Sequence, residues 1–135
     1  QAAVLRIKLR QLDNYIDARR SVAAAYDAAF AQLPGVEIPY RAADSRHVFH
    51  QYTLKLKSHS RDALQAHLKA AGIPSMIYYP IPAHRQQMFG KFNLGDLQLP
   101  LTEALCQQVI SLPIHTEMDE QQLDYIIQHV LSFFK

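Results

Sequence analysis

The sequence predicts an α/β fold of two layers, with a long N-terminal helix followed by a small sheet packed against helices. Two observations lead to this prediction. Apolar residues recur at helical spacing over residues 1–33 and again over residues 119–134. Between them, short segments rich in β-branched and aromatic residues alternate with further helical patterns. Such an alternation is typical of a domain in which helices cover a sheet.

The opening segment, residues 1–33, predicts one long amphipathic helix. Its apolar stripe consists of Leu5, Leu9, Leu12, Ile16, Ala23, Phe30 and Leu33. The helix should end at Pro34-Gly35, because proline cannot continue a helix and glycine favours its end. No Ser, Thr, Asp or Asn precedes the first turn to cap it, and the chain begins with Gln1. We therefore expect a chain cut from within a larger protein.

The rest of the chain divides into short elements. Ser60 is placed to cap a helix that Gly72 ends. The other predicted elements are, in order, a strand over 48–56, a strand over 73–79, a helical turn over 85–89, a loop over 90–100, a helix capped by Thr102, a strand over 109–112 and a helix over 119–134. No internal repeat or linker interrupts this order, so residues 1–135 form one domain.

Composition narrows the class of protein. The 135 residues are 49% hydrophobic and 19% charged, which is globular composition. No apolar run approaches the roughly 20 residues of a membrane-spanning helix, so no membrane insertion is expected. The formal charge of +2 comes from scattered Lys and Arg, which argues against a nucleic-acid partner. Cys106 is the only cysteine, and its apolar neighbours favour a buried, inert thiol in a reducing cytoplasm.

The segment from Gly72 to Gln86 contains the strongest candidate site. Pro74, Pro80 and Pro82 stiffen it and force an extended path. A stiff loop of this kind presents its polar side chains at one place, here Tyr78, Tyr79 and His84. Judged on these residues alone, two tyrosines at the end of a strand are more often a transition from core to surface than a ligand site.

This segment, together with His47 to Thr53 and Val109 to His115, resembles the C-terminal part of a known family. The family is that of the DegT/DnrJ/EryC1/StrS sugar aminotransferases, and all three segments stand in its order. The sequence from Tyr78 to Gln86 is most similar to that of enzymes that aminate a UDP-linked 3-keto-hexuronic acid. This substrate is UDP-2-acetamido-2-deoxy-3-oxo-glucuronate, and the enzymes act in lipopolysaccharide (O-antigen) biosynthesis.

The resemblance implies the small domain of a fold-type I aminotransferase, with residues 1–33 as an interdomain helix and 34–135 as the α/β domain. It implies a cytoplasmic homodimer that uses pyridoxal 5'-phosphate to transfer an amino group from glutamate to a nucleotide-linked keto-sugar. It also implies that Tyr78, Tyr79 and His84 lie beside the sugar, and that His50 or Gln51 touches substrate. Arg85 would pair with an anionic group of the substrate, or else lie in solvent.

The Schiff-base lysine of the family stands in a Ser-x-x-Lys setting. Ser132-Phe133-Phe134-Lys135 has these letters, but it ends a helix whose phenylalanines belong to the core pattern. Lys91, in a loop, is no better supported. We therefore expect no catalytic or cofactor-binding residue in this chain, and no cofactor bound to it alone.

Two alternatives remain to be weighed. A metal site at His47 and His50 is disfavoured, because residues three apart on a strand point to opposite faces and no third ligand is placed to join them. The second alternative is a stand-alone binding or regulatory module that takes a small ligand near Tyr79 and His84. Such a module should begin with a capped element, which this chain does not.

Overall fold

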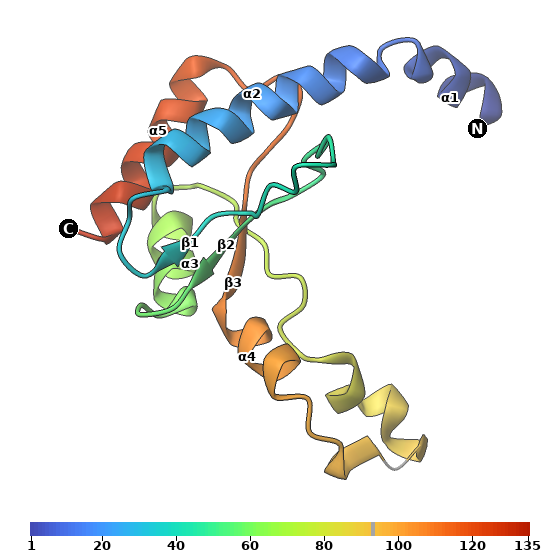
Figure 1. Cartoon of the computed structure of the whole chain (residues 1–135), viewed down its shortest axis with the longest axis vertical. Coiled ribbons are helices and arrows are strands. Elements are labelled where there is room, and N and C mark those ends of the chain that lie inside the picture. Colours follow the sequence, from blue (N-terminus) through green and yellow to red (C-terminus); the bar gives the residue numbers. More distant parts are fainter. Residues whose placement is uncertain (93) are drawn as a thin grey trace.

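The computed structural model describes residues 1–92 and 94–135. Within them, three strands form one antiparallel sheet in the order β1-β2-β3. The strands are β1 (Val36–Glu37), β2 (Tyr52–Leu56) and β3 (Val109–Leu112). The helices are α1 (Ala2–Leu9), α2 (Leu12–Phe30), α3 (Arg61–Ala70), α4 (Pro100–Gln108) and α5 (Glu120–Phe133). Helices α2, α3 and α5 gather around the sheet (Figure 1), so the two-layer α/β prediction is confirmed.

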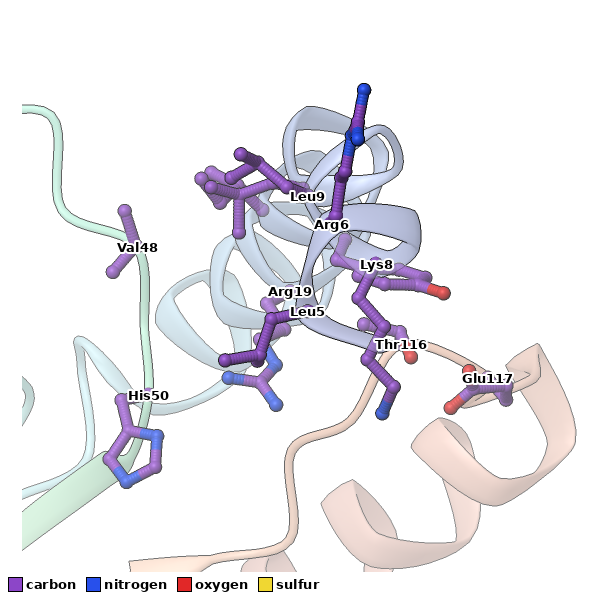
Figure 2. Close-up of a pocket in the computed structure, with 12 residues that line it drawn as sticks. Leu5, Arg6, Lys8, Leu9, Arg19, Val48, His50, Thr116 and Glu117 are labelled. Carbon is purple, nitrogen blue, oxygen red and sulfur yellow. The ribbon is translucent and has the colours of Figure 1, made fainter. Parts of the chain in front are cut away.

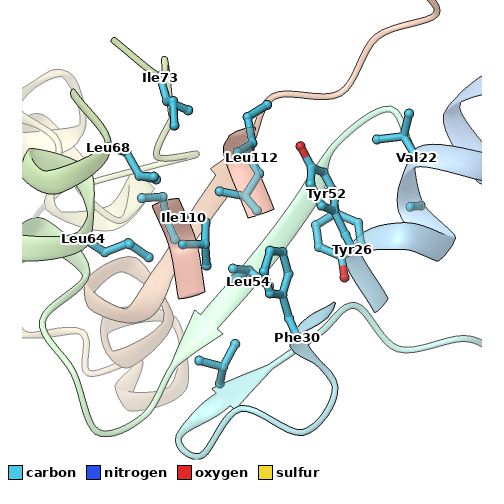
Figure 3. Close-up of a cluster of buried hydrophobic side chains, with 14 of the residues drawn as sticks. Val22, Tyr26, Phe30, Tyr52, Leu54, Leu64, Leu68, Ile73, Ile110 and Leu112 are labelled. Carbon is cyan, nitrogen blue, oxygen red and sulfur yellow. The ribbon is translucent and has the colours of Figure 1, made fainter. Parts of the chain in front are cut away.

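The side chains of the central strand β2 alternate between a buried face of the sheet and a partly exposed face. Tyr52, Leu54 and Leu56 are buried, whereas Thr53 and Lys55 between them are partly exposed. This alternation follows from the period of a strand, whose successive side chains point to opposite faces. The buried face is covered by apolar residues of α2 and α3 (Figure 3) and of α5.

Aromatic side chains join α2 to the sheet. Tyr26 stacks on Phe30 with ring centroids 5.6 Å apart and meets Tyr52 at 4.9 Å. All three are fully buried. The Tyr26 hydroxyl donates a hydrogen bond to the carbonyl of Pro113 at 2.8 Å, so the burial leaves no unpaired donor. Burial raises the pKa of Tyr26 far above its ordinary value.

The prediction of a single helix over residues 1–33 is wrong. The chain leaves the helix at Arg10 and Gln11, where Gln11 takes φ −106° and ψ 4°. The backbone tightens there into bonds between residues three apart, from the Gln11 N–H to the carbonyl of Lys8 at 2.9 Å. Helix α1 buries no residue. No packed core therefore keeps α1 in line with α2. The predicted apolar stripe is divided between two helices.

The predicted helix ends are confirmed for α3 and α5. Ser60 accepts a hydrogen bond from the Ala63 N–H at 3.2 Å, and Asp119 forms a capping box with Gln122. The predicted cap at Thr102 is wrong. Helix α4 begins one turn earlier, after Leu99 and with Pro100 in its first turn, a position that proline tolerates because no hydrogen-bond donor is needed there.

Of the predicted strands, one is shorter than expected and one is absent from the described structure. The segment 48–56 pairs only from Tyr52 onward, because Phe49 has φ 48° and turns the chain out of the extended conformation. The segment 73–79 is not a strand. It meets β3 at a single bridge, Met76 with Ser111. Pro74 lacks the N–H that a longer ladder would use. The predicted strand over 109–112 is confirmed as β3.

After Met76 the chain leaves the sheet and forms a projecting segment, residues 77–108, which we call the arm (Figure 1). It contains short 3-10 helices at Ala83–Arg85, Gln87–Phe92 and Leu94–Asp96, and then α4. The loop predicted over 90–100 is therefore partly helical, and residue 93 of it lies outside the described residues. Cys106, in α4, is buried with a free thiol, as predicted.

No helix in the described ranges has both the length and the apolar character needed to cross a membrane.

Candidate functional site

The site begins with Phe49, whose backbone lies in the left-handed region. Its φ of 48° is uncommon for a bulky residue. The Phe49 ring is buried, with 3% of its surface exposed, while Val48 and His50 on either side are exposed. The Phe49 N–H donates to Nδ1 of His47 at 3.0 Å. One buried ring thus fixes the turn, and His50 is held at the surface as a result.

The loop that carries Phe49 is tied to α2 by charged groups. The Arg41 guanidinium lies 3.9 Å from the centre of the Phe49 ring and pairs with the carboxylate of Asp27. The other oxygen of Asp27 accepts a hydrogen bond from the Tyr52 hydroxyl at 2.8 Å. Arg20 donates to the carbonyl of His47 at 3.1 Å. Helix α2 therefore determines where His50 is presented.

Burial raises the pKa of Tyr52, and its hydrogen bond to the Asp27 carboxylate raises it further. The Tyr52 hydroxyl therefore remains protonated and donates to Asp27. This partly buried bond is part of the support beneath the site.

His50, Gln51 and Tyr78 line one small cavity of about 230 Å³. The end of β3 supplies the opposite wall, from Ser111 to Ile114. The bridge between Met76 and Ser111 brings Tyr78 there, with backbone bonds of 3.0 and 2.7 Å in the two directions. An imidazole, a carboxamide and a phenol thus face one space from segments far apart in the sequence. Together they offer several hydrogen-bond donors to a polar ligand.

His50 is also shared with two neighbouring cavities. One, of about 320 Å³, is lined by His47, Gln51 and Thr53. The other, of about 1030 Å³, lies between the opening helices and the turn at Thr116-Glu117 (Figure 2). His50 therefore lies where the three spaces meet, and a ligand longer than one sugar ring could extend from one into another.

Tyr79 differs from Tyr78 in exposure. Tyr79 is 68% exposed and Tyr78 is 42% exposed, with their rings edge to face at 5.9 Å. Tyr79 does not line the cavity of Tyr78. The structure therefore leaves the Tyr79 phenol at the surface, next to the described site.

His84 and Arg85 are held in a separate cluster. Nε2 of His84 lies 2.9 Å from Oε1 of Glu103, and Arg85 reaches the same oxygen at 3.1 Å. The His84 side chain is buried. The hydrogen bond from His84, and then that from Arg85, hold the pKa of Glu103 below its usual range. This cluster joins the first 3-10 helix of the arm to α4.

Five of the six predicted site residues therefore fall into two groups. His50, Gln51 and Tyr78 come together, whereas His84 and Arg85 are engaged with Glu103. Tyr79 belongs to neither group. The expectation that His47 and His50 point to opposite faces of a strand is wrong, because the strand begins at Tyr52. Sequence reasoning missed Glu103, since nothing in its local pattern distinguishes it from an exposed residue in the first turn of a helix.

The lysines of this chain do not fit the covalent anchor of pyridoxal phosphate. Lys57 and Lys55 pair with Glu37 and lower its pKa. The other lysines, Lys8, Lys69, Lys91 and Lys135, are exposed. A Schiff-base lysine has to lie in an enclosed site that lowers its pKa, and these positions offer no enclosure. Across residues 1–92 and 94–135, no group of three or more His, Cys, Asp or Glu side chains is arranged to hold a metal ion.

Comparison with known proteins adds an evolutionary relationship. The profile of the DegT/DnrJ/EryC1/StrS aminotransferase family matches residues 1–131. A pleiotropic regulatory protein of Geobacillus stearothermophilus is 37% identical over all of this chain and 36% of its own length. The UDP-N-acetyl-3-dehydro-alpha-D-glucosamine 3-aminotransferase of Acidithiobacillus ferrooxidans is 40% identical over 91% of this chain and 32% of its own.

The UDP-2-acetamido-2-deoxy-3-oxo-D-glucuronate aminotransferase of Pseudomonas aeruginosa is 35% identical over 93% of this chain and 33% of its own. Among solved structures, DesV of S. venezuelae, in complex with a ketimine intermediate, superimposes with a TM-score of 0.92 at 36% identity. The match includes all of this chain and 36% of the DesV chain. The chain thus spans about a third of the length of the relatives it matches.

Proposed function

Because the chain belongs to the DegT/DnrJ/EryC1/StrS aminotransferase family, we propose that it is the small, C-terminal domain of a pyridoxal-phosphate-dependent sugar aminotransferase. The enzyme transfers an amino group from glutamate to a nucleotide-linked keto-sugar. The observation that carries this proposal is the meeting of His50, Gln51 and Tyr78 in one cavity beside the end of β3. Residues 1–33 connect the two domains and residues 34–135 form the substrate-binding one.

In this proposal the chain supplies substrate contacts. His50 and Gln51 donate hydrogen bonds to the hydroxyl or acetamido groups of the sugar, and Tyr78 closes the other side of the cavity. Tyr79, exposed beside them, meets the sugar from the mouth of the site. His84 and Arg85 act through Glu103 and hold the arm in place, so we treat them as positioning residues.

Bound pyridoxal phosphate would supply the electron sink that amino transfer requires. Since the lysines of this chain do not fit its anchor, we place the cofactor on the remainder of the protein. Borohydride reduction of this chain with pyridoxal phosphate, followed by mass analysis, should give no stoichiometric lysine adduct. A single adduct on Lys91 or Lys135 would contradict this assignment.

The finer assignment is a UDP-linked 3-keto-hexuronic acid of bacterial surface polysaccharide, used by a cytoplasmic homodimer. It is supported by relatives whose names specify UDP-linked 3-oxo or 3-dehydro sugars. Other relatives act on dTDP-linked sugars, so the nucleotide is the least constrained part of the proposal.

The test uses the complete aminotransferase that contains this chain, loaded with pyridoxal phosphate and supplied with glutamate. Mass spectrometry should detect an amino sugar nucleotide and 2-oxoglutarate when a UDP-linked 3-keto sugar is added. Replacing His50 by Ala should raise KM by about tenfold, the usual result of losing a hydrogen bond to substrate. His59→Ala, at an exposed position that lines none of these cavities, is the matched control. Absence of product with every UDP- and dTDP-linked keto-sugar would overturn the proposal.

The second candidate is a regulatory module without catalysis, and the name of the Geobacillus stearothermophilus relative favours it. The same assay separates the two. A regulatory module binds its ligand through His50 and Tyr78 and yields no 2-oxoglutarate.

A further inference from the structure

Two hydroxyl groups meet on the face of the sheet that is turned away from the core. Oγ1 of Thr53, on β2, lies 2.8 Å from Oγ of Ser111, on β3. The two residues stand directly opposite each other in the ladder. Ile110 and Leu112, on either side of Ser111, belong to the core, so the Ser111 side chain points to the other face. Neither hydroxyl was predicted to have a role.

The backbone of Ser111 explains why the two hydroxyls come so close. The Ser111 N–H donates to the carbonyl of Met76 at 2.7 Å, and the Ser111 carbonyl accepts from the Met76 N–H at 3.0 Å. Both backbone groups of Ser111 therefore point away from Thr53. In an antiparallel ladder, the side chains of a pair that shares no backbone hydrogen bond lie closer together. At this place the hydroxyls make the polar contact between the strands.

Burial decides which hydroxyl donates. Ser111 is only 5% exposed, whereas Thr53 is partly exposed. A buried hydroxyl whose hydrogen finds no acceptor lowers stability, so Ser111 donates to Thr53. The hydrogen of the Thr53 hydroxyl is then left over, and Oγ1 of Thr53 makes no other hydrogen bond in the described part of the chain. Thr53 therefore has one donor to offer to another molecule.

The Thr53 side chain lies where a ligand of the candidate site would pass. It lines the cavity of about 320 Å³ together with His47, His50 and Gln51. His50 and Gln51 also line the cavity that contains Tyr78. A sugar in contact with these two residues is thus next to the Thr53 hydroxyl.

We propose that Thr53 donates a hydrogen bond to an oxygen of the keto-sugar, and that Ser111 is a positioning residue for the Thr53 hydroxyl. The inference rests on the proposed function and adds a specificity-determining residue to the sugar site. Because Ser111 uses one lone pair of Oγ1, it turns Thr53 into a donor toward the cavity. Thr53 then favours a substrate with an acceptor oxygen at this position over an analogue that lacks it.

The test uses the complete aminotransferase with pyridoxal phosphate and glutamate. Thr53→Val keeps the shape of the side chain and removes its hydroxyl, so KM for the keto-sugar nucleotide should rise about tenfold with kcat nearly unchanged. Thr53→Ser retains the hydroxyl and should keep the wild-type KM. Thr102→Val makes the same change at an exposed position on α4, outside both cavities, and is the matched control. An unchanged KM in Thr53→Val would overturn the proposal.

The role of Ser111 is tested separately. Ser111→Ala should raise KM about threefold, because the Thr53 hydroxyl loses the hydrogen bond that orients it. In the Thr53→Val background, Ser111→Ala should change KM no further, since no hydroxyl is left to position. The double variant also serves if Thr53→Val alone folds poorly, because it leaves neither hydroxyl buried without a partner. An unchanged KM in the double variant would overturn the proposal.

Substrate analogues identify the partner oxygen. Each analogue lacks one hydroxyl or the acetamido group of the sugar. For one of them, wild type and Thr53→Val should have the same KM, because the two changes remove the same hydrogen bond. If Thr53→Val raises KM equally for every analogue, Thr53 acts on the fold and the inference is wrong.

The outcome for this inference can be separated from that of the proposed function. If the sugar is aminated and KM stays the same in all Thr53 and Ser111 variants, the inference fails while the proposed function stands. If no keto-sugar nucleotide is aminated, the proposed function fails, and binding of N-acetylglucosamine to the complete protein decides the inference. A Kd about tenfold higher in Thr53→Val than in wild type would support the Thr53 contact. An equal Kd, or no binding, would overturn it.

Discussion

Nε2 of His84 and Oε1 of Glu103 lie 2.9 Å apart and join the start of the arm to α4. Arg85 donates to the same oxygen. One carboxylate therefore holds two side chains of the first 3-10 helix, and the path of the arm beyond Pro82 depends on it. The sequence analysis assigned His84 and Arg85 to substrate binding. In the structure, both side chains bind Glu103 and so connect two parts of the arm.

Replacing Glu103 by Gln should loosen the arm and leave the core intact. The amide keeps the size of the side chain and loses the charge that both partners use. Hydrogen exchange should speed up over residues 83–106 and stay unchanged in β2 and α5. Asp124→Asn, which removes a carboxylate from an exposed position on α5, is the control. Equal exchange in wild type and Glu103→Gln would show that the shared carboxylate does not hold the arm.

The same contact makes the arm sensitive to acid. The hydrogen bond from His84, and then that from Arg85, lower the pKa of Glu103 in the folded state. Its contribution to stability is therefore complete above the ordinary glutamate pKa of about 4.3 and is lost as the pH falls through the lowered value. Exchange protection in the arm, followed from neutral pH downward, should fall in that range. Glu103→Gln should lack this transition.

Two glycines form a matched pair for testing backbone strain. Gly35 and Gly72 have nearly the same positive φ, 75° and 73°. A Cβ at Gly35 would lie 1.8 Å from Oγ of Ser58, whereas a Cβ at Gly72 would meet nothing within 4 Å. Gly72→Ala should cost about 1 kcal/mol, the left-handed penalty alone. Gly35→Ala should cost more, as measured by urea unfolding, unless Ser58 is also replaced by Gly. Equal costs would mean that Ser58 moves aside freely.

The Tyr52 hydroxyl supports the site from below. Tyr52→Phe removes its hydrogen bond to Asp27 and should lower the free energy of unfolding by about 1 kcal/mol. Leu54→Ala, one step along the same face of β2, should cost about 2–5 kcal/mol because it leaves a cavity in the core. Tyr40→Phe is the control, since Tyr40 is 85% exposed. Urea unfolding measures the loss of unfolding free energy in each of the three variants. If Tyr52→Phe costs no more than Tyr40→Phe, the hydrogen bond to Asp27 does not stabilise the site.

Helix α1 and the start of α2 should make this chain associate with itself when it is alone in solution. Leu5, Leu9 and Leu12 are 64%, 66% and 45% exposed, and an exposed apolar stripe on a helix favours contacts between chains. Sedimentation velocity at rising concentration should show dimers or larger species. Leu5→Gln with Leu9→Gln should restore the monomer, while Leu101→Gln, also exposed but on α4, should not. A monomer at all concentrations would contradict this prediction.

Sequence reasoning succeeded where one local pattern decides the structure. Ser60 was identified as a cap because a side-chain oxygen ahead of an apolar run has one evident use. The strand at Val109–Leu112 followed from its composition and its position between helices. The two-layer fold followed from the order of these elements.

Sequence reasoning failed where the local structure depends on contacts between residues far apart in the sequence. The break at Gln11 has no glycine or proline to mark it and follows a helix, α1, that buries no residue. The left-handed Phe49 is held by the core and by Arg41, which is itself fixed by Asp27, 22 residues before Phe49 in the sequence. The partner of His84 lies 19 residues away on α4. His50, Gln51 and Tyr78 of the candidate site were identified from the sequence motifs, while the role of Glu103 became clear only from the structure.

The bridge between Met76 and Ser111 has a consequence for how this fold can vary. The arm leaves the sheet beside Met76 and returns to it at Val109, two residues before the paired Ser111. Both ends are thus fixed at one place on the sheet, and most of the core lies outside the arm. Insertions, deletions or a whole exchange of residues 80–105 between relatives can then change what the domain recognises without rebuilding the scaffold that carries it.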